Sequence, residues 1–281
     1  MLDSFYAGVS GMTKSNQRLD VTGNNLANVN TVGFKKSRAM FKDLVYNEIK
    51  QPRNETNGRG GIHTLQSGIG VTTASIDRVH TVGNAQSTGR PLDVMLSGPG
   101  MFVVLSGENE ASEPLYTRSG NFFLDSNGYL LTHDGKYVAR ADDRPFGSSF
   151  GQNLVTLSRI QLPADAQDVR INSVGAVLYN DLAGNVRQAG RIVVALTANE
   201  EGLEKVGQNY YQISENSGEI RLAYPGQGEL GELIPETLEM SNVDVGEELT
   251  ELILSQRHFQ ASAQAVKTSD EILQEIANLR R

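Results

Sequence analysis

The sequence predicts an α+β fold, in which long N- and C-terminal α-helices flank a central antiparallel β domain. Near both ends of the chain, apolar residues recur at alternating spacings of three and four. The middle instead carries short apolar runs separated by turn dipeptides, and a polar, glycine-rich stretch without period precedes it. With 281 residues, the chain is long enough for one large or two modest domains.

The N-terminal helix is predicted from a seam of residues with heptad-like spacing. The seam comprises Leu2, Phe5, Val9, Met12, Asn16, Leu19, Gly23 and Leu26. Glycine in a helix costs roughly 0.5–1 kcal/mol relative to alanine, so Gly23 should loosen the helix locally. Because Asn16 also interrupts the seam, the helix is expected to be weak alone and to gain stability when neighbours cover it.

The C-terminal helix is predicted from a second seam, in a stretch of about 35 residues, or about 50 Å, without glycine or proline. This seam comprises Leu249, Leu252, Gln256, Phe259, Ala263, Val266, Leu273 and Ala277, and Ile253, Ile272, Ile276 and Leu279 widen it. Two interpretations remain open. The helix either packs on a compact domain, or both terminal helices pair with each other or with other chains, in a coiled-coil-like layer.

The middle of the chain is predicted to be an antiparallel sheet or a barrel, because turn dipeptides separate runs such as "MFVVL" and "RIVVAL". The dipeptides are Asn127-Gly128, Asp134-Gly135, Gly184-Asn185 and Ser217-Gly218. The predicted organisation is an N-terminal helix over residues 1–45, an extended connector over 46–67, a β-rich domain over 68–235 and a C-terminal helix over 236–281.

Composition excludes several classes. The chain has no cysteine, so disulfides and thiolate metal sites are absent, and the four histidines show no ligand spacing. A net charge of -8 argues against a nucleic-acid partner, which usually meets a basic face. We expect no membrane insertion, because no window approaches 18 consecutive apolar residues. The N-terminus lacks the features of a cleaved signal peptide, which predicts a cytoplasmic protein unless export reads an uncleaved N-terminus.

Two motifs of enzymes occur without the context that their chemistry needs. Gly226–Gly231 matches G-x-G-x-x-G, but prolines flank it closely, and Glu229 and Glu232 would repel a phosphate. A glycine-rich turn is the simpler interpretation.

The second motif, Gly147–Gly151, matches G-x-S-x-G. A nucleophile at Ser149 would need a later histidine as its base, and only His258, in the predicted C-terminal helix, follows. We therefore expect no catalytic, cofactor-binding or metal residue, no cofactor, and no enzyme.

The ends of the chain resemble the terminal signatures of bacterial flagellar rod and hook proteins. The N-terminal residues that carry the resemblance are Asn24, Asn25, Leu26, Ala27 and Asn28, followed by Thr31, Gly33, Phe34 and Lys35. At the other end, "SNV" at residues 241–243 precedes an acidic helix start, and Gln256-Arg257 precedes an aromatic residue. The middle is similar to the β domain of the same family, and the chain length and "FKDLVYNEIKQP" favour a distal rod subunit over a proximal rod or hook paralogue.

The resemblance implies a structural subunit of a helical tube, with the terminal helices as inner layer, the β domain as outer layer and the connector bridging neighbours. Its implied partners are copies of itself, adjacent rod and hook proteins, and the flagellar type III export apparatus, which would export it without signal cleavage to the basal body. The rival interpretation from another class is a soluble β-domain enzyme or binding module with packed terminal helices.

The predicted assembly interface combines both seams with the asparagine-rich stretch. It comprises Leu2, Phe5, Val9, Met12, Asn16, Leu19, Asn24, Asn25, Leu26, Asn28, Gly33, Phe34, Leu249, Leu252, Gln256, Phe259, Ala263, Val266 and Leu273. Asparagine carries both a donor and an acceptor, so it can satisfy polar groups of a neighbour within such a seam. Gly33 is expected to end the N-terminal helix as its C-cap.

Overall fold

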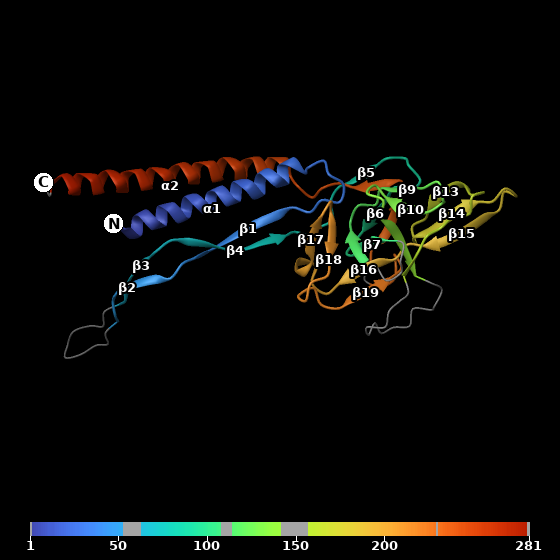
Figure 1. The fold of residues 1–281 in the computed structure, drawn as a ribbon, viewed down its shortest axis with the longest axis horizontal. Helices are drawn as coiled ribbons and strands as arrows, with labels where there is room; N and C mark the ends of the chain where they lie inside the picture. The colour runs from blue at the N-terminus through green and yellow to red at the C-terminus, as the bar shows by residue number, and fades with distance from the viewer. Residues whose placement is uncertain (1, 53–62, 108–113, 142–156, 229, 280–281) are drawn as a thin grey trace. The chain divides into compact units, whose positions relative to one another are not determined.

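The computed structural model describes residues 2–52, 63–107, 114–141, 157–228 and 230–279 (Figure 1). It divides the chain into two compact units. Unit 1 consists of Met1–Ala27, Ser37–Val79 and Asp244–Arg281, and unit 2 consists of Asn28–Lys36 and His80–Val243. The chain therefore leaves unit 1 after its first helix, contributes a short segment to unit 2, and then returns to unit 1.

Unit 1 is built on helices α1 (Leu2–Ala27) and α2 (Val245–Leu279), which confirms the two predicted terminal helices. They run antiparallel. Early in α1, Gly8 faces Val266, and at its end Asn25 bonds to Glu248 in the first turn of α2. The finer prediction, coiled-coil packing of the two helices, stays a prediction.

The boundaries of both helices follow from local hydrogen bonds. Asp244 caps α2, because its Oδ1 accepts from the backbone N–H groups of Gly246 at 2.7 Å and Glu247 at 3.1 Å. Helix α1 ends at Ala27, earlier than the predicted residue 45, and the chain turns at once, with the Thr31 N–H donating to the Asn28 carbonyl at 3.1 Å.

Two antiparallel strand pairs complete unit 1. Strand β1 (Ser37–Asp43) pairs with β4 (Val71–Arg78), and β2 (Tyr46–Lys50) pairs with β3 (Leu65–Gly68). Part of the predicted connector thus forms strands within the described residues. The domain boundaries drawn from the sequence remain a prediction.

Unit 2 is β-rich, and the strand pairs among its described residues are antiparallel. The largest sheet has the path β17-β18-β8-β7-β11-β10-β9, with β12 on β11, and with β16 on β7 and β19. Its strands are β7 (Met101–Leu105), β8 (Pro114–Thr117), β9 (Phe122–Leu124), β10 (Leu130–Thr132), β11 (Tyr137–Ala141), β12 (Leu157–Arg159), β16 (Val194–Thr197), β17 (Glu204–Gly207), β18 (Tyr210–Gln212) and β19 (Ile220–Ala223).

Smaller sheets complete unit 2. A three-stranded sheet contains β13 (Gln167–Ile171), β14 (Ala176–Asn180) and β15 (Val186–Arg191), and a short 3-10 helix lies at Glu200–Gly202. The last strands return to early ones: β20 (Glu232–Pro235) pairs with β6 (Val94–Ser97), and β21 (Thr237–Glu239) pairs with β5 (Ala85–Ser87).

Three predicted turns close hairpins. Gly128, Gly135 and Gly184 have φ values of 78°, 77° and 77°, and they lie between β9 and β10, β10 and β11, and β14 and β15, respectively. Only glycine adopts this left-handed conformation readily, so the sequence marks these turns clearly. The Ser217-Gly218 turn instead separates β18 from β19, which pair with other strands.

The hydrophobic core lies in unit 2. The Phe102 and Phe122 rings pack edge to face, 5.4 Å apart, in a cluster that also includes Leu96 and Ile160. A second cluster packs around Val103, with Tyr116 and Tyr211. The α+β class with a mostly antiparallel middle is therefore confirmed.

Candidate assembly site

The helical seams of the predicted interface line the contact between α1 and α2 only in part. The half-buried members are Phe5, Val9, Met12, Leu19, Leu26, Leu252, Phe259, Ala263, Val266 and Leu273. The exposed members are Asn16, Asn24, Leu249 and Gln256, and Leu2 begins α1. None of the described seam residues with a large apolar side chain is fully buried, so this single chain leaves both seams incompletely covered.

Further apolar side chains lie in the open on α2. They are Val245, Leu249, Ile253, Leu254, Ile272, Ile276 and Leu279, with exposed fractions from 43% to 84%. On α1, Tyr6 is 59% exposed. Large exposed apolar surface on a protein is typical of a region that another molecule covers.

Two glycines of α1, which sequence reasoning missed, allow the helices to approach closely. A Cβ at Gly8 would lie 2.8 Å from Val266 Cγ2, and one at Gly11 would lie 3.0 Å from Ser262 Oγ. By contrast, a Cβ at Gly23 would meet nothing within 4 Å. The spacing of three between the first two glycines, on one helix face, is the signal that could have revealed them.

Asn25 makes intrachain bonds that join three segments of unit 1. Its Nδ2 donates to the Ser37 carbonyl at 2.8 Å, and its Oδ1 accepts from the Ser37 N–H at 3.0 Å. The same Nδ2 donates to Glu248 Oε2 at 3.2 Å. The side chain is 2% exposed. The sequence analysis predicts that Asn25 contacts a neighbouring chain in the assembly. The hydrogen-bond partners in this structure lie in the same chain.

Asn28 belongs to unit 2, where its Oδ1 accepts from the Thr31 hydroxyl at 3.1 Å. The next signature residues, at 31–36, are packed inside unit 2 rather than on a helix. Gly33 has φ +67°, and a Cβ there would lie 2.7 Å from the Ser119 nitrogen. Because α1 ends at Ala27, the prediction that Gly33 caps the helix is wrong, and close packing explains the glycine.

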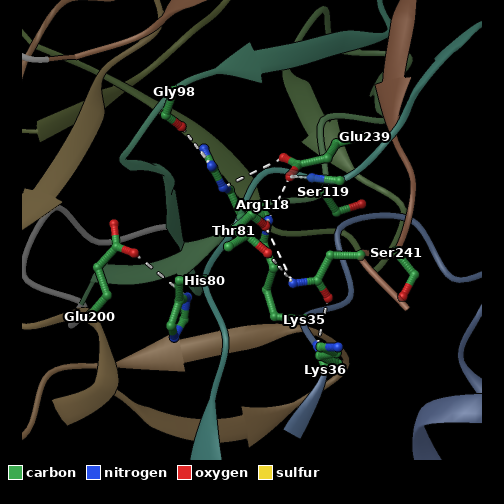
Figure 2. Close-up of polar contacts among 12 residues, drawn as sticks. Lys35, Lys36, His80, Thr81, Gly98, Arg118, Ser119, Glu200, Glu239 and Ser241 are labelled. Carbon is green, nitrogen blue, oxygen red and sulfur yellow. Dashed lines mark hydrogen bonds and ion pairs between the residues drawn. The ribbon is translucent and has the colours of Figure 1, made fainter. Parts of the chain in front are cut away.

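The side chain of Lys35 forms a buried ion pair with Glu239 (Figure 2). Its Nζ lies 2.6 Å from Glu239 Oε1 and donates to the Thr81 carbonyl at 2.6 Å. Lys35 is 1% exposed, and Glu239 is fully buried. Burial lowers the pKa of the Lys35 ammonium, while Glu239 partly offsets this by favouring the charged form. Removing one partner of such a pair typically costs about 3–5 kcal/mol.

Glu239 also contacts a backbone N–H group and a second cation. Its Oε1 accepts from the Gly83 N–H at 2.9 Å, and its Oε2 lies 3.5 Å from Arg118 Nε. The Arg118 guanidinium, 3% exposed, donates to the Gly98 carbonyl at 2.6 Å. The cluster is therefore an internal charge network of unit 2.

Glu200 lies at the edge of the same network. Burial raises the pKa of its carboxyl, and the Arg118 and Lys35 charges oppose that shift. Its Oε2 is 3.9 Å from His80 Nδ1. The carboxylates of Glu200 and Glu239 and the cations of Lys35 and Arg118 therefore balance one another's charge within unit 2.

Two matches to enzyme motifs remain, and the structure describes only one of them. Gly226 and Gly228 lie in a turn, and strand β20 begins at Glu232, so no helix N-terminus follows this motif. The G-x-S-x-G match at residues 147–151 lies outside the described residues. Within the described ranges, no three histidine or carboxylate side chains could hold a metal ion together, and no helix is both long and apolar enough to cross a membrane.

Comparison with known proteins gives matches along the chain. Residues 5–35 match the family model "Flagella basal body rod protein", residues 95–179 match "Flagellar hook protein FlgE/F/G D1 domain", and residues 234–279 match "Flagellar basal body rod FlgEFG protein C-terminal". These matches place the chain in the class of rod and hook proteins of the bacterial flagellum.

Similar proteins sharpen this result. The flagellar basal-body rod protein FlgG of Bacillus subtilis is 43% identical over 282 residues, covering 100% of both chains. FlgG of Caulobacter vibrioides is 33% identical, covering 99% of this chain and 100% of its own. The flagellar hook protein FlgE of Borreliella burgdorferi is 26% identical, with full coverage of both. The chain belongs to the family of the flagellar basal-body rod protein FlgG.

Proposed function

We propose that this chain is a structural subunit of the distal basal-body rod, which assembles helically with copies of itself into a tubular drive shaft for motility. The observation that carries the proposal is the incomplete burial of unit 1. The buried apolar side chains of the described residues all belong to unit 2, whereas α2 alone exposes seven large apolar residues. A helix pair of this kind gains its missing burial from neighbouring copies.

The geometry of such contacts favours a filament. When different patches of two copies meet and the rotation does not close a ring, addition continues as a helical tube. In this arrangement the terminal helices form the inner layer and the β domain the outer layer. The rod and hook names of the relatives support rod and hook proteins as neighbours. The proposed role needs no catalytic residue or cofactor.

We further propose export by the flagellar type III apparatus without signal cleavage. A helix pair without a core of its own is only marginally stable before assembly, so the ends of the free chain can thread an export channel unfolded. We infer the distal position in the rod from the sequence identity to FlgG over the whole chain. A proximal rod subunit would share the same fold.

Electron microscopy of the purified chain over a concentration series tests the proposal. We expect tubes above a threshold concentration, and their loss in the double variant Leu249→Ser/Ile253→Ser on the open face of α2. The matched control is Leu182→Ser in unit 2, which is also exposed, at 70%. A compact monomer at every concentration, with both helices protected from amide exchange, would favour the rival enzyme or binding module.

Asn25→Ala and Asn28→Ala provide a second test. Both variants should keep unit 2 folded and should impair assembly, with Asn127→Ala in an exposed turn of unit 2 as the control. Normal tubes from both variants would show that these asparagines do not serve assembly.

A further inference from the structure

Helix α1 contacts two neighbours within unit 1, helix α2 and the strand pair β1–β4 (Figure 1). The residues of α1 that meet α2 form one stripe along the helix: Gly8, Gly11, Arg18 and Asn25. The residues that meet β4 and the glycine before it are Ala7, Ser10 and Gln17. Each of these three stands one position before a residue that meets α2, and one position is a rotation of about 100° around the helix. The two contacts therefore use different sides of α1.

The apolar seam of α1 lies on a third side. Val9, Met12, Leu19 and Leu26 each stand one position after a residue that meets α2, so they are turned about 100° in the opposite sense, away from the strand pair. Phe5 lies one helical turn before Val9. We call these five residues the front stripe. All of them are half-buried, so their own chain covers them only in part.

Helix α2 meets α1 largely through polar residues, which displaces its apolar residues to the flanks. The contact includes Glu248, Glu251, Ser262 and Val266, and Ser255 between them is 1% exposed. One position before this contact lie Leu254, Ala261 and Ala265, and the same side continues to Ile272 and Leu279. We call these five residues the back stripe. Leu254 and Ile272 are 49% exposed and Leu279 is 84% exposed, so this stripe is open.

The front and back stripes lie on opposite sides of the helix pair. In an antiparallel pair, residues that are rotated in the same sense from the contact lie on the same side. The front stripe is rotated toward later positions on α1, and the back stripe toward earlier positions on α2. A subunit with two different apolar sides can add copies front to back without closing, which is the contact that a filament needs.

We propose that the front stripe of one copy packs on the back stripe of the next copy, with the two helices antiparallel. This inference rests on the proposed function. Copies in a helical tube share one polarity, and α1 and α2 run antiparallel within a chain. Helices that run along the tube must therefore also meet antiparallel between copies. The stripes match in length, since Phe5 to Leu26 spans about 32 Å and Leu254 to Leu279 about 38 Å.

The spacing of residues along the two stripes sets the register. The proposed contact places Val9 opposite Ile272. Ten residues further along α1 is Leu19, and eleven residues back along α2 is Ala261. A large side chain then meets a small one, which lets two helices approach closely without leaving a void. The ends of the stripes, seven residues further on each helix, also coincide.

Disulfide crosslinking tests the contact directly, because the sequence contains no cysteine. Tubes are assembled from an equal mixture of Val9→Cys and Ile272→Cys chains and are oxidised mildly. The control mixture replaces Val9→Cys by Thr13→Cys, at an exposed position of α1 turned away from α2. A disulfide needs Cα atoms within about 7 Å, so we expect at least about ten times more covalent dimer from the first mixture.

Two results of this experiment would overturn the proposal. Equal yields from the two mixtures would mean that Val9 and Ile272 do not meet. Efficient dimers from Val9→Cys chains alone would mean that two front stripes meet around a two-fold axis, which closes the contact instead of propagating it.

A compensating pair of substitutions tests the register. Ala261 is exposed in the free chain, so Ala261→Leu should leave the fold intact and raise the threshold concentration for tubes by about tenfold or more. Adding Leu19→Ala should lower the threshold again. The matched control is Gln264→Leu, at an exposed position turned away from α1. An unchanged threshold in Ala261→Leu, or no recovery in the double variant, would overturn the pairing of Leu19 with Ala261.

The crosslinking result is separable from the proposed function. If the unmodified chain forms no tubes, the proposed function fails, and crosslinking of the dispersed chain at high concentration still decides whether the two stripes meet. If tubes form but the mixture of Val9→Cys and Ile272→Cys yields no more dimer than the control, the pairing of the stripes is overturned while helical assembly stands.

Discussion

The two units differ in how their residues are buried. Unit 2 encloses side chains such as Phe102, Val104 and Ile192 completely. In unit 1, the buried residues of the described ranges that are not glycine are polar: Thr22, Asn25, Glu248 and Ser255. A β unit with its own core can fold alone, whereas a helix pair fixed by polar contacts and half-covered seams depends on what surrounds it.

The contrast concerns the source of stability in each unit. The β unit carries its own stability. The helices carry exposed apolar surface, which is a liability in a monomer and the source of affinity in an assembly. The buried polar residues of unit 1 set which segments meet, because each unmade bond of a buried group costs about 1–3 kcal/mol.

The largest expected effect is on the core of unit 2. Phe102→Ala should lower the free energy of unfolding by about 3–5 kcal/mol, because it removes a fully buried ring. Phe259→Ala truncates a half-buried side chain of α2. It should lower the free energy of unfolding of the free chain by less than about 1 kcal/mol and should act mainly on assembly. Denaturant unfolding followed by tyrosine fluorescence measures both. Similar losses in the two variants would remove the contrast.

The next effect concerns the buried ion pair. Glu239→Gln keeps an oxygen for the Gly83 N–H but leaves Lys35 and Arg118 without their anion, so unit 2 should lose about 3 kcal/mol. The control is Asp181→Asn, which breaks the exposed pair with Arg187 and should cost less than about 1 kcal/mol. Equal denaturant midpoints for the two variants would mean that burial does not increase the contribution of the Lys35–Glu239 pair to stability.

A smaller effect appears at alkaline pH. Burial raises the pKa of Tyr116 from 10.0 to about 12. Between these values the unfolded chain binds fewer protons than the folded chain, so the stability of unit 2 should fall as pH rises above 10. At about 1.4 kcal/mol per pKa unit, Tyr116 accounts for up to about 2–3 kcal/mol by pH 12.

Tyr116→Phe should reduce this alkaline loss, which unfolding midpoints at several pH values would measure. The loss should not vanish, because burial also raises the pKa of Tyr210. An identical pH profile for the variant would show that Tyr116 titrates normally in the folded protein.

The smallest effect is expected within unit 1. Arg18 Nη2 lies 2.6 Å from Glu251 Oε2, but both side chains are about a third exposed, at 37% and 34%. Glu251→Gln should therefore cost about 0.2–1 kcal/mol, and less at high salt. Calorimetry of assembled tubes at two salt concentrations measures it. A larger, salt-independent loss would mean that this pair is buried in the assembly.

The sequence predicts the elements well where the signal is local. The 35-residue α2 follows from a long periodic stretch without glycine or proline, and three hairpins follow from glycines at left-handed positions. Periodicity and turn chemistry depend on near neighbours, which is why they are visible without a structure.

The sequence does not predict contacts between distant residues. Lys35 looks like one of two exposed lysines after a helix, and only the fold brings Glu239 beside it, 204 positions away. Asn25 is similar: its character as donor and acceptor is evident, but its partners Ser37 and Glu248 are not. Gly33 signals a special backbone position without revealing that Ser119 approaches it.

The most direct measurement compares amide exchange in α1 and in β7 before and after assembly. The account predicts weak protection of Leu2 to Leu26 in the free chain, strong protection in the tube, and high protection of β7 in both states. Strong protection of α1 in the free chain, equal to that of β7, would contradict the claim that unit 1 depends on its neighbours for stability.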